Sequence, residues 1–290
     1  MNALMRLAAA AACVWLALCT GSAWSQAYPN RSIRLISPFP PGGLADLMGR
    51  IGAEGLAQQT GQQVVVDNRT GAGGNIGTDL AAKAAPDGYT LVIVAAGNLV
   101  INPFLYPSLP FDPLNDLVPV FNMGEAPQLV LINASSPATT LKEFIALAKG
   151  TPGGINYGSA GSGSTMHLAG DHFARLTGVP MTHVPYKGAA QVLTDLLGGR
   201  VQFFSVGLGV VSQQLQSGAL RALAVAAPRR LSALPNVPTA AEAGLPGFEM
   251  TTWFGFLAPR GTSAEIVQFL NGRLQKVLDD PQNRKRLADA

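Results

Sequence analysis

The residues best suited to chemistry lie in two glycine-rich loops, each between a predicted strand and a predicted helix. The first is Pro38-Phe39-Pro40-Pro41-Gly42-Gly43, and the second is Tyr157-Gly158-Ser159-Ala160-Gly161-Ser162-Gly163-Ser164-Thr165. Glycine allows a ligand to approach the backbone, and the amides at the start of a helix have no partner and carry the positive end of its dipole. These loops predict a site that holds an anion such as a carboxylate through backbone N–H groups. The alternative is that they are plain turns.

Three side chains near these loops each have two interpretations. Asp46 either caps the helix after the first loop or touches the ligand. His167, in the first turn after the second loop, either donates to the ligand or holds the loop. Lys187 either attracts an anion or is an ordinary surface lysine.

Several catalytic and cofactor motifs are excluded. No Gly-Lys-Ser/Thr follows the second loop, so it is not a P-loop. It is not a nucleophile elbow either, because Tyr157 and Ala160 stand where Gly-x-Ser-x-Gly needs its first glycine. His167 and His172 are five residues apart and point to different helix faces, so they do not form a zinc pair. No paired carboxylates or catalytic triad are evident, and we predict no catalytic residue, no metal and no cofactor.

The segment from Gly71 to Gly77 resembles a dinucleotide-binding fingerprint with one extra residue. It does not directly follow the first strand, and no acidic residue stands clearly at the end of the next strand. The sequence favours a structural turn or part of a cleft rim. An enzyme that binds a phosphate-bearing cofactor at the glycine-rich loops is the alternative function.

An alternation of strands and helices must position these loops. Strands at 32–37, 63–67 and 89–95 are separated by helical patterns, which predicts a mostly parallel sheet covered by helices. The rhythm resumes after a proline-rich passage at 103–119, interpreted as irregular. We therefore predict two α/β lobes, with residues 28–125 plus 250–290 in the first and 126–249 in the second.

Composition supports an ordered protein with a large core. Of 290 residues, 48% are hydrophobic and 13% are charged, which argues against disorder and against a coiled coil. Twenty basic and 17 acidic residues leave a net charge of +3, and the single basic run, Arg284-Lys285-Arg286, suits the solvated face of a helix. Nucleic-acid binding has no support.

The pattern of the N-terminal residues predicts an export signal. Arg6 precedes an apolar run from Leu7 to Cys19, which is too short for a comfortable membrane span, and Ser25-Gln26-Ala27 offers small residues for cleavage. We predict a cleaved signal peptide at residues 1–27. An uncleaved anchor and a lipoprotein are weaker alternatives. Both cysteines, Cys13 and Cys19, lie in this segment, so the mature chain would have no thiol.

Most of the mature chain resembles the tripartite tricarboxylate transporter substrate-binding family, the Bug-type periplasmic receptors. The following segments carry the resemblance: Tyr28 to Leu35, Pro38 to Gly43, Val64 to Gly74, Ala85 to Leu91, Asn102 to Tyr106, His183 to Gly188, Leu220 to Val225 and Leu234 to Thr239. The resemblance implies a two-lobed, type II periplasmic-binding-protein fold of the α/β class, with the ligand cleft between the lobes. The family usually continues for some tens of residues beyond position 290, so we expect a truncated C-terminal helix.

The resemblance also implies a function and a set of contacts. The expected ligand is a small organic anion: a di- or tricarboxylate, an aromatic acid or an acidic amino acid. A monomeric receptor in the periplasm would pass it to a two-component membrane permease, or alternatively signal to a membrane sensor. The expected ligand-binding residues are Phe39, Gly42, Gly43, Asp46, Gly97, Asn98, Ser159, Ala160, Gly163, Ser164, Thr165, His167, Pro185, Tyr186, Lys187, Val206 and Gly207.

Overall fold

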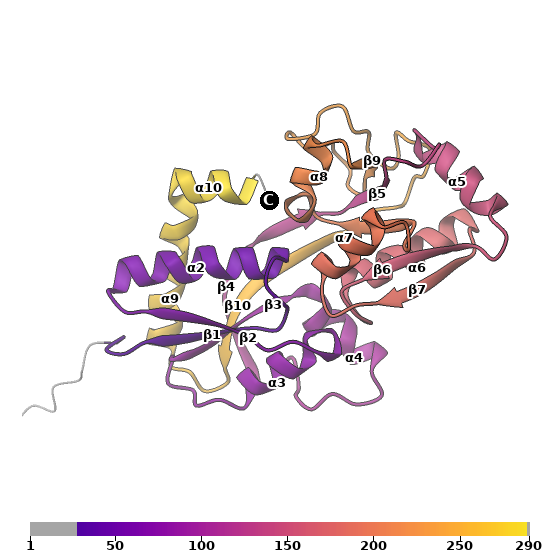
Figure 1. Ribbon diagram of the computed structural model, residues 1–290. Helices are drawn as coiled ribbons and strands as arrows, with labels where there is room; N and C mark the ends of the chain where they lie inside the picture. The colour runs from indigo at the N-terminus through magenta and orange to yellow at the C-terminus, as the bar shows by residue number, and fades with distance from the viewer. Residues whose placement is uncertain (1–27, 289–290) are drawn as a thin grey trace, which may run out of the picture. The chain divides into compact units, whose positions relative to one another are not determined.

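The computed structural model describes residues 28–288, and the chain from Arg31 onward forms one compact unit. The predicted signal peptide at 1–27 lies outside the described residues. Two five-stranded sheets organise the compact unit into two lobes (Figure 1). None of the helices between residues 28 and 288 is both long and apolar enough to cross a membrane.

The first sheet has the strand order β2-β1-β3-β10-β4. Its strands are β1 (Ile33–Ser37), β2 (Val64–Asn68), β3 (Thr90–Ala95), β4 (Leu117–Pro127) and β10 (Thr251–Pro259). β1 pairs in parallel with β2 and β3, as the strand–helix rhythm predicts. β10 runs antiparallel to β3 and β4, so the sheet is mixed.

Helices cover both faces of the first sheet. The helices and helical turns of this lobe are α2 (Leu44–Thr60), η1 (Ala72–Gly74), α3 (Asn75–Ala82), η2 (Gly97–Ile101), α4 (Asn102–Leu105), α9 (Ala264–Asp279) and α10 (Pro281–Ala288). α2 and α3 lie on opposite faces (Figure 1), as right-handed crossovers in the strand order β2-β1-β3 require. The central part of β3 is apolar: Leu91, Val92, Ile93 and Val94 are all 0% exposed.

Glycines allow α2 and α9 to pack closely together. A Cβ built on Gly52 would lie 3.3 Å from Leu274 of α9, and one built on Gly55 would collide with Val277 of the same helix. The missing side chains let the backbone of α2 pack directly against α9. α9 therefore lies on the same lobe as α2.

The second sheet has the order β7-β6-β8-β5-β9. Its strands are β5 (Leu129–Asn133), β6 (Ile155–Ser159), β7 (Met181–Pro185), β8 (Phe203–Val206) and β9 (Leu220–Val225). Its helices are α5 (Leu141–Gly150), α6 (Thr165–Thr177), α7 (Ala189–Leu197), η3 (Leu208–Val210) and α8 (Ser212–Gln216). β6 is parallel to β7 and β8, whereas β5 is antiparallel to β8 and β9.

The expected irregular passage contains an unforeseen strand. Part of the segment interpreted as irregular belongs to β4, an 11-residue edge strand that contains Pro119 and ends at Pro127. Its pairing with β10 shifts register twice, between Phe254 and Gly255 and between Phe256 and Leu257. Register shifts break the two-residue alternation by which a strand is recognised, and an edge position tolerates proline.

Candidate ligand-binding site

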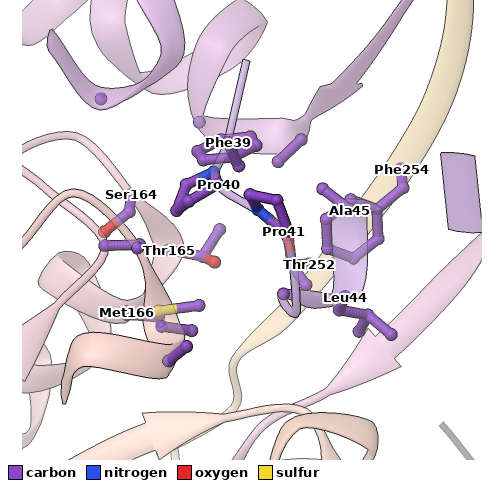
Figure 2. Close-up of a pocket in the computed structure, with 18 residues that line it drawn as sticks. Phe39, Pro40, Pro41, Leu44, Ala45, Ser164, Thr165, Met166, Thr252 and Phe254 are labelled. Carbon is purple, nitrogen blue, oxygen red and sulfur yellow. The ribbon is translucent and has the colours of Figure 1, made fainter. Parts of the chain in front are cut away.

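A cavity of about 50 Å³ lies between the loops that follow the strands of both sheets. Figure 2 shows Pro40 and Pro41 on one side of it and Thr165 and Met166 on another. The residues that line it are Phe39, Pro40, Pro41, Gly43, Leu44, Ala45, Gly73, Ala95, Gly97, Ala160, Ser164, Thr165, Met166, Gly188, Ala189, Ala190, Thr252 and Phe254.

Three helices begin at this cavity. The start of α2 contributes Gly43 to Ala45, the start of α6 contributes Ser164 to Met166, and the start of α7 contributes Gly188 to Ala190. The N-caps of α2 and α7 are glycines that supply no side-chain hydrogen bond. The first amides of these helices are therefore left for another acceptor, and each helix adds roughly half a positive charge at this end.

The cavity has no formal charge of its own. None of its lining residues is Asp, Glu, Lys, Arg or His. Hydroxyls come only from Ser164, Thr165 and Thr252. The positive potential inside therefore comes from the backbone, which is the arrangement found where helix starts hold an anion.

Asp46 braces the first loop instead of lining the cavity. Its carboxylate accepts from the backbone N–H of Gly42 at 3.3 Å, from Asn68 at 3.0 Å and from Arg50 at 2.9 Å. Asn68 also donates to the carbonyl of Phe39 at 2.8 Å. Burial acts to raise the pKa of Asp46, but the hydrogen bonds from Arg50, Asn68 and Gly42 outweigh it and lower the pKa below its usual range. The carboxylate is thus a fixed anchor for the loop.

Hydroxyl groups brace the second loop in the same way. Ser164 Oγ donates to the carbonyl of Gly161 at 2.7 Å and accepts from the N–H of His167 at 3.2 Å, which caps α6. Ser159 Oγ accepts from the N–H of Gly161 at 3.1 Å and lies 2.6 Å from Nε2 of His183. Because the hydroxyls of Ser159 and Ser164 already form hydrogen bonds within the protein, the donors that this loop offers to a ligand are the backbone amides of Thr165 and Met166.

Two stacked histidines lie behind the second loop. The rings of His167 and His183 are 4.1 Å apart, and Tyr157 stacks on His183 at 5.0 Å. Nδ1 of His167 accepts from the N–H of Gly163 at 3.3 Å. Burial, together with the charge of His167, lowers the pKa of His183 to about 4, so this imidazole is neutral at pH 7.

Glycines set how closely the loops approach each other. A Cβ on Gly97 would collide with the carbonyl of Gly163, and a Cβ on Gly163 would collide with Asn102. Gly73, with a φ of +63°, lies where a Cβ would be 2.5 Å from the carbonyl of Ser162. Tyr106 adds a bond across the same contact, its hydroxyl donating to Ser162 at 3.1 Å.

Gly42 and Gly43 differ in what they tolerate. Gly42 has a φ of +86°, which strains any other residue, although there is space around it. Gly43 has a φ of −91° and a Cβ there would lie 4.0 Å from its nearest neighbour. The backbone angle therefore restricts substitution at Gly42. At Gly43, an added side chain would compete only with a ligand for space in the cavity.

The structure brings six of the expected binding residues to the cavity: Phe39, Gly43, Gly97, Ala160, Ser164 and Thr165. Eleven others do not line it: Gly42, Asp46, Asn98, Ser159, Gly163, His167, Pro185, Tyr186, Lys187, Val206 and Gly207. Several of these support the loops. Asn98 is 0% exposed and bonds Ala95 and Gly73, and the Tyr186 hydroxyl donates to Asp195 at 2.6 Å. The side chain of Lys187 is exposed. Direct contact of these residues with a ligand stays a prediction.

Sequence reasoning missed the contributions of α7 and β10. Gly188 to Ala190 have the same pattern as the other two loops, a glycine directly before a helix. The pattern is weaker here because it contains a single glycine. Thr252 and Phe254 reach the cavity only because β10 returns to the first sheet beside β3. That pairing joins residues more than 150 positions apart, which local patterns do not reveal. Within residues 28–288, no group of three or more His, Cys, Asp or Glu side chains could hold a metal ion.

Comparison with known proteins gives the family. Residues 48–290 match the family model described as the tripartite tricarboxylate transporter family receptor. The chain belongs to this family. Its members are receptors of a transport system and not enzymes, as the resemblance implies.

Individual relatives agree over most of the chain. BugT of Bordetella pertussis is 41% identical over 252 residues, covering 87% of this chain and 77% of the relative. Among solved structures, Rpa4515 of Rhodopseudomonas palustris with adipate is 38% identical with a TM-score of 0.88, covering 90% of this chain and 88% of that one. MatC of the same organism, with bound malate, is 35% identical with a TM-score of 0.86, covering 90% and 89%. These likenesses confirm the two-lobed α/β fold.

Proposed function

We propose that this chain is a periplasmic receptor that binds a small carboxylate in the cavity and delivers it to the permease of a tripartite tricarboxylate transporter. One observation carries the proposal: α2, α6 and α7 all begin at a single cavity whose lining has no charged side chain. Desolvated helix starts can hold an anion without a basic residue. The adipate and malate bound to Rpa4515 and MatC support a carboxylate as the ligand class.

Two lobes joined by two passages of the chain suit capture by closure. We place the first lobe at residues 28–125 plus 250–290 and the second at 126–249, so that the chain passes between them at the end of β4 and just before β10. The contacts of Gly97 with Gly163 and of Tyr106 with Ser162 join the two, and these contacts would have to open for the ligand to enter. Closure would then exclude water and strengthen the amide–carboxylate bonds.

Export and assembly complete the proposal. Removal of residues 1–27 would release a monomeric receptor into the periplasm, where a two-component permease would accept its ligand. Intact-mass measurement on exported protein would show cleavage near Ala27, and a retained N-terminus would contradict it.

A thermal-shift screen of small carboxylates tests the binding function. A ligand at 100 times its dissociation constant should add about 2.7 kcal/mol to the free energy of unfolding. A shift with one or more acids, and no chemical change of the bound acid by NMR over hours, is the expected result. Turnover of the acid would contradict a receptor.

A further inference from the structure

Thr252 presents a hydroxyl that the protein leaves unused. The residue is 4% exposed, lies in β10 and lines the cavity beside Phe254 (Figure 2). Its Oγ1 is buried and has no hydrogen-bond partner among the described residues. A buried hydroxyl without a partner costs roughly 1–3 kcal/mol, and a valine of the same shape would avoid that cost.

Three buried threonines outside the cavity do not share this property. Thr78, Thr177 and Thr262 each donate to a backbone carbonyl, at 2.9, 2.7 and 2.8 Å. Because these hydroxyls are satisfied by their own helix or turn, they need nothing from a ligand. Thr252 differs from these three, since its Oγ1 lacks a partner and the residue lines the cavity.

The remaining wall of the cavity is apolar. Side chains of Phe39, Pro40, Pro41, Leu44, Met166 and Phe254 make up most of it. This wall suits a hydrocarbon or aromatic body. A second ionised carboxylate placed against it would meet no positive side chain, and an ionised group with so little compensation is expensive to bury.

We infer that the ligand is a monocarboxylate whose apolar body carries one uncharged polar group, such as a hydroxyl, a ketone or an amide, and that Thr252 recognises this group. The inference rests on the proposed function. The helix starts hold the carboxylate, the apolar wall holds the body, and Thr252 Oγ1 forms the hydrogen bond that selects the substituent. Thr252 is therefore a specificity-determining residue of the site.

Two matched series of acids test the inference by calorimetry on the full exported chain. The aliphatic series is hexanoate, 6-hydroxyhexanoate and adipate, and the aromatic series is benzoate, 4-hydroxybenzoate and terephthalate. In each, only the terminal group changes, from hydrogen to hydroxyl to carboxylate. In at least one series the hydroxy acid should bind about tenfold tighter than both others, which corresponds to about 1.4 kcal/mol.

Variants separate recognition from folding. Thr252→Val should remove the tenfold advantage of the hydroxy acid and leave the parent acid unchanged, whereas Thr252→Ser should keep the advantage. Thr251→Val is the matched control, because Thr251 is exposed on the same strand and does not line the cavity. The melting temperature of unliganded Thr252→Val should not fall, since no hydrogen bond within the protein is lost.

Three results would overturn the inference. The diacid could bind tightest in both series, Thr252→Val could weaken all acids of a series equally, or it could leave the preference for the hydroxy acid intact. These outcomes leave carboxylate binding itself in place. Failure of every acid in both series to bind would instead contradict the proposed function, and the inference with it.

Discussion

Gly97 controls how near the binding loops come to each other. Its missing Cβ leaves room for the carbonyl of Gly163, and the contact lies at the edge of the cavity. Such a glycine is required by a close approach and not by its own backbone angles, so its effect should appear in ligand binding more than in folding.

Gly97→Ala should therefore weaken binding of a carboxylate at least tenfold, because the second loop must move away from the first. The free energy of unfolding of the unliganded protein should change by no more than about 1 kcal/mol. Calorimetry and urea unfolding measure the two quantities. Gly272→Ala is the control, because it has open space around its Cβ position in α9 and should leave affinity unchanged.

Asp46 determines whether the first loop holds its shape. Asp46→Asn keeps the size of the side chain but removes the charge that Arg50, Asn68 and Gly42 all bond. Loss of these bonds to a buried carboxylate should reduce the free energy of unfolding by about 1–3 kcal/mol. Asp171→Asn removes an exposed helix pair with Arg175 and should cost less than about 0.5 kcal/mol. An equal loss of unfolding free energy in Asp46→Asn and Asp171→Asn, measured by urea unfolding, would contradict a structural role for Asp46 in the first loop.

His183 should make stability depend on pH. Its pKa in the folded protein is about 4, against about 6.5 for a free imidazole, so the unfolded chain takes up the proton first as pH falls. The stability contributed by neutral His183 is complete above pH 6.5 and declines towards pH 4. The melting temperature of the wild type should fall more across this window than that of His183→Gln. Identical slopes for the two proteins would contradict a neutral, half-buried His183.

The start of α6 joins capping and binding in one turn. Ser164 caps this helix through His167 while the next amides line the cavity, whereas Ser263 caps α9 through Ile266. A cap positions the first turn and so fixes where its free amides point. The same residue type thus has two different consequences in two helices.

Ser164→Ala and Ser263→Ala should each reduce the free energy of unfolding by about 0.5–2 kcal/mol. Only Ser164→Ala should also lower carboxylate affinity, and by less than Gly97→Ala, because the backbone amides remain. Chemical denaturation and calorimetry on both variants measure this. A loss of affinity in Ser263→Ala equal to that in Ser164→Ala would mean that general destabilisation explains both.

Most helices and strands could be predicted from local patterns, and the exception has a physical reason. The expected strands at 32–37 and 89–95 are found as β1 and β3, each beginning one residue later. β4 was missed because its two register shifts against β10 hide the alternation of buried and exposed residues. Apolar periodicity reports a regular surface, and a bulged edge strand does not have one.

The arrangement of the two lobes explains which parts of the site could be foreseen. Loops after parallel strands gather at one edge of a sheet, so Gly43 and Thr165 could be assigned to a cleft from the order of the strands alone. Thr252 could not, because it depends on β10 crossing back between β3 and β4. The alternation of strands and helices and the family resemblance both predicted the two lobes. The apolar wall and the unpartnered hydroxyl depend on contacts between segments that are distant in the sequence.

Recognition of a carboxylate by backbone amides, and not by a basic side chain, can be tested with an acid and its neutral amide. The tightest-binding acid of the screen and its primary amide should be titrated into the wild type and into Lys187→Ala. The acid should bind at least about a hundredfold tighter than the amide, since two charge-assisted hydrogen bonds contribute roughly 1.5–3 kcal/mol each. Lys187→Ala should bind the acid as the wild type does, because Lys187 is exposed and does not line the cavity. Equal binding of acid and amide, or loss of acid binding in Lys187→Ala, would contradict an anion site built from helix starts.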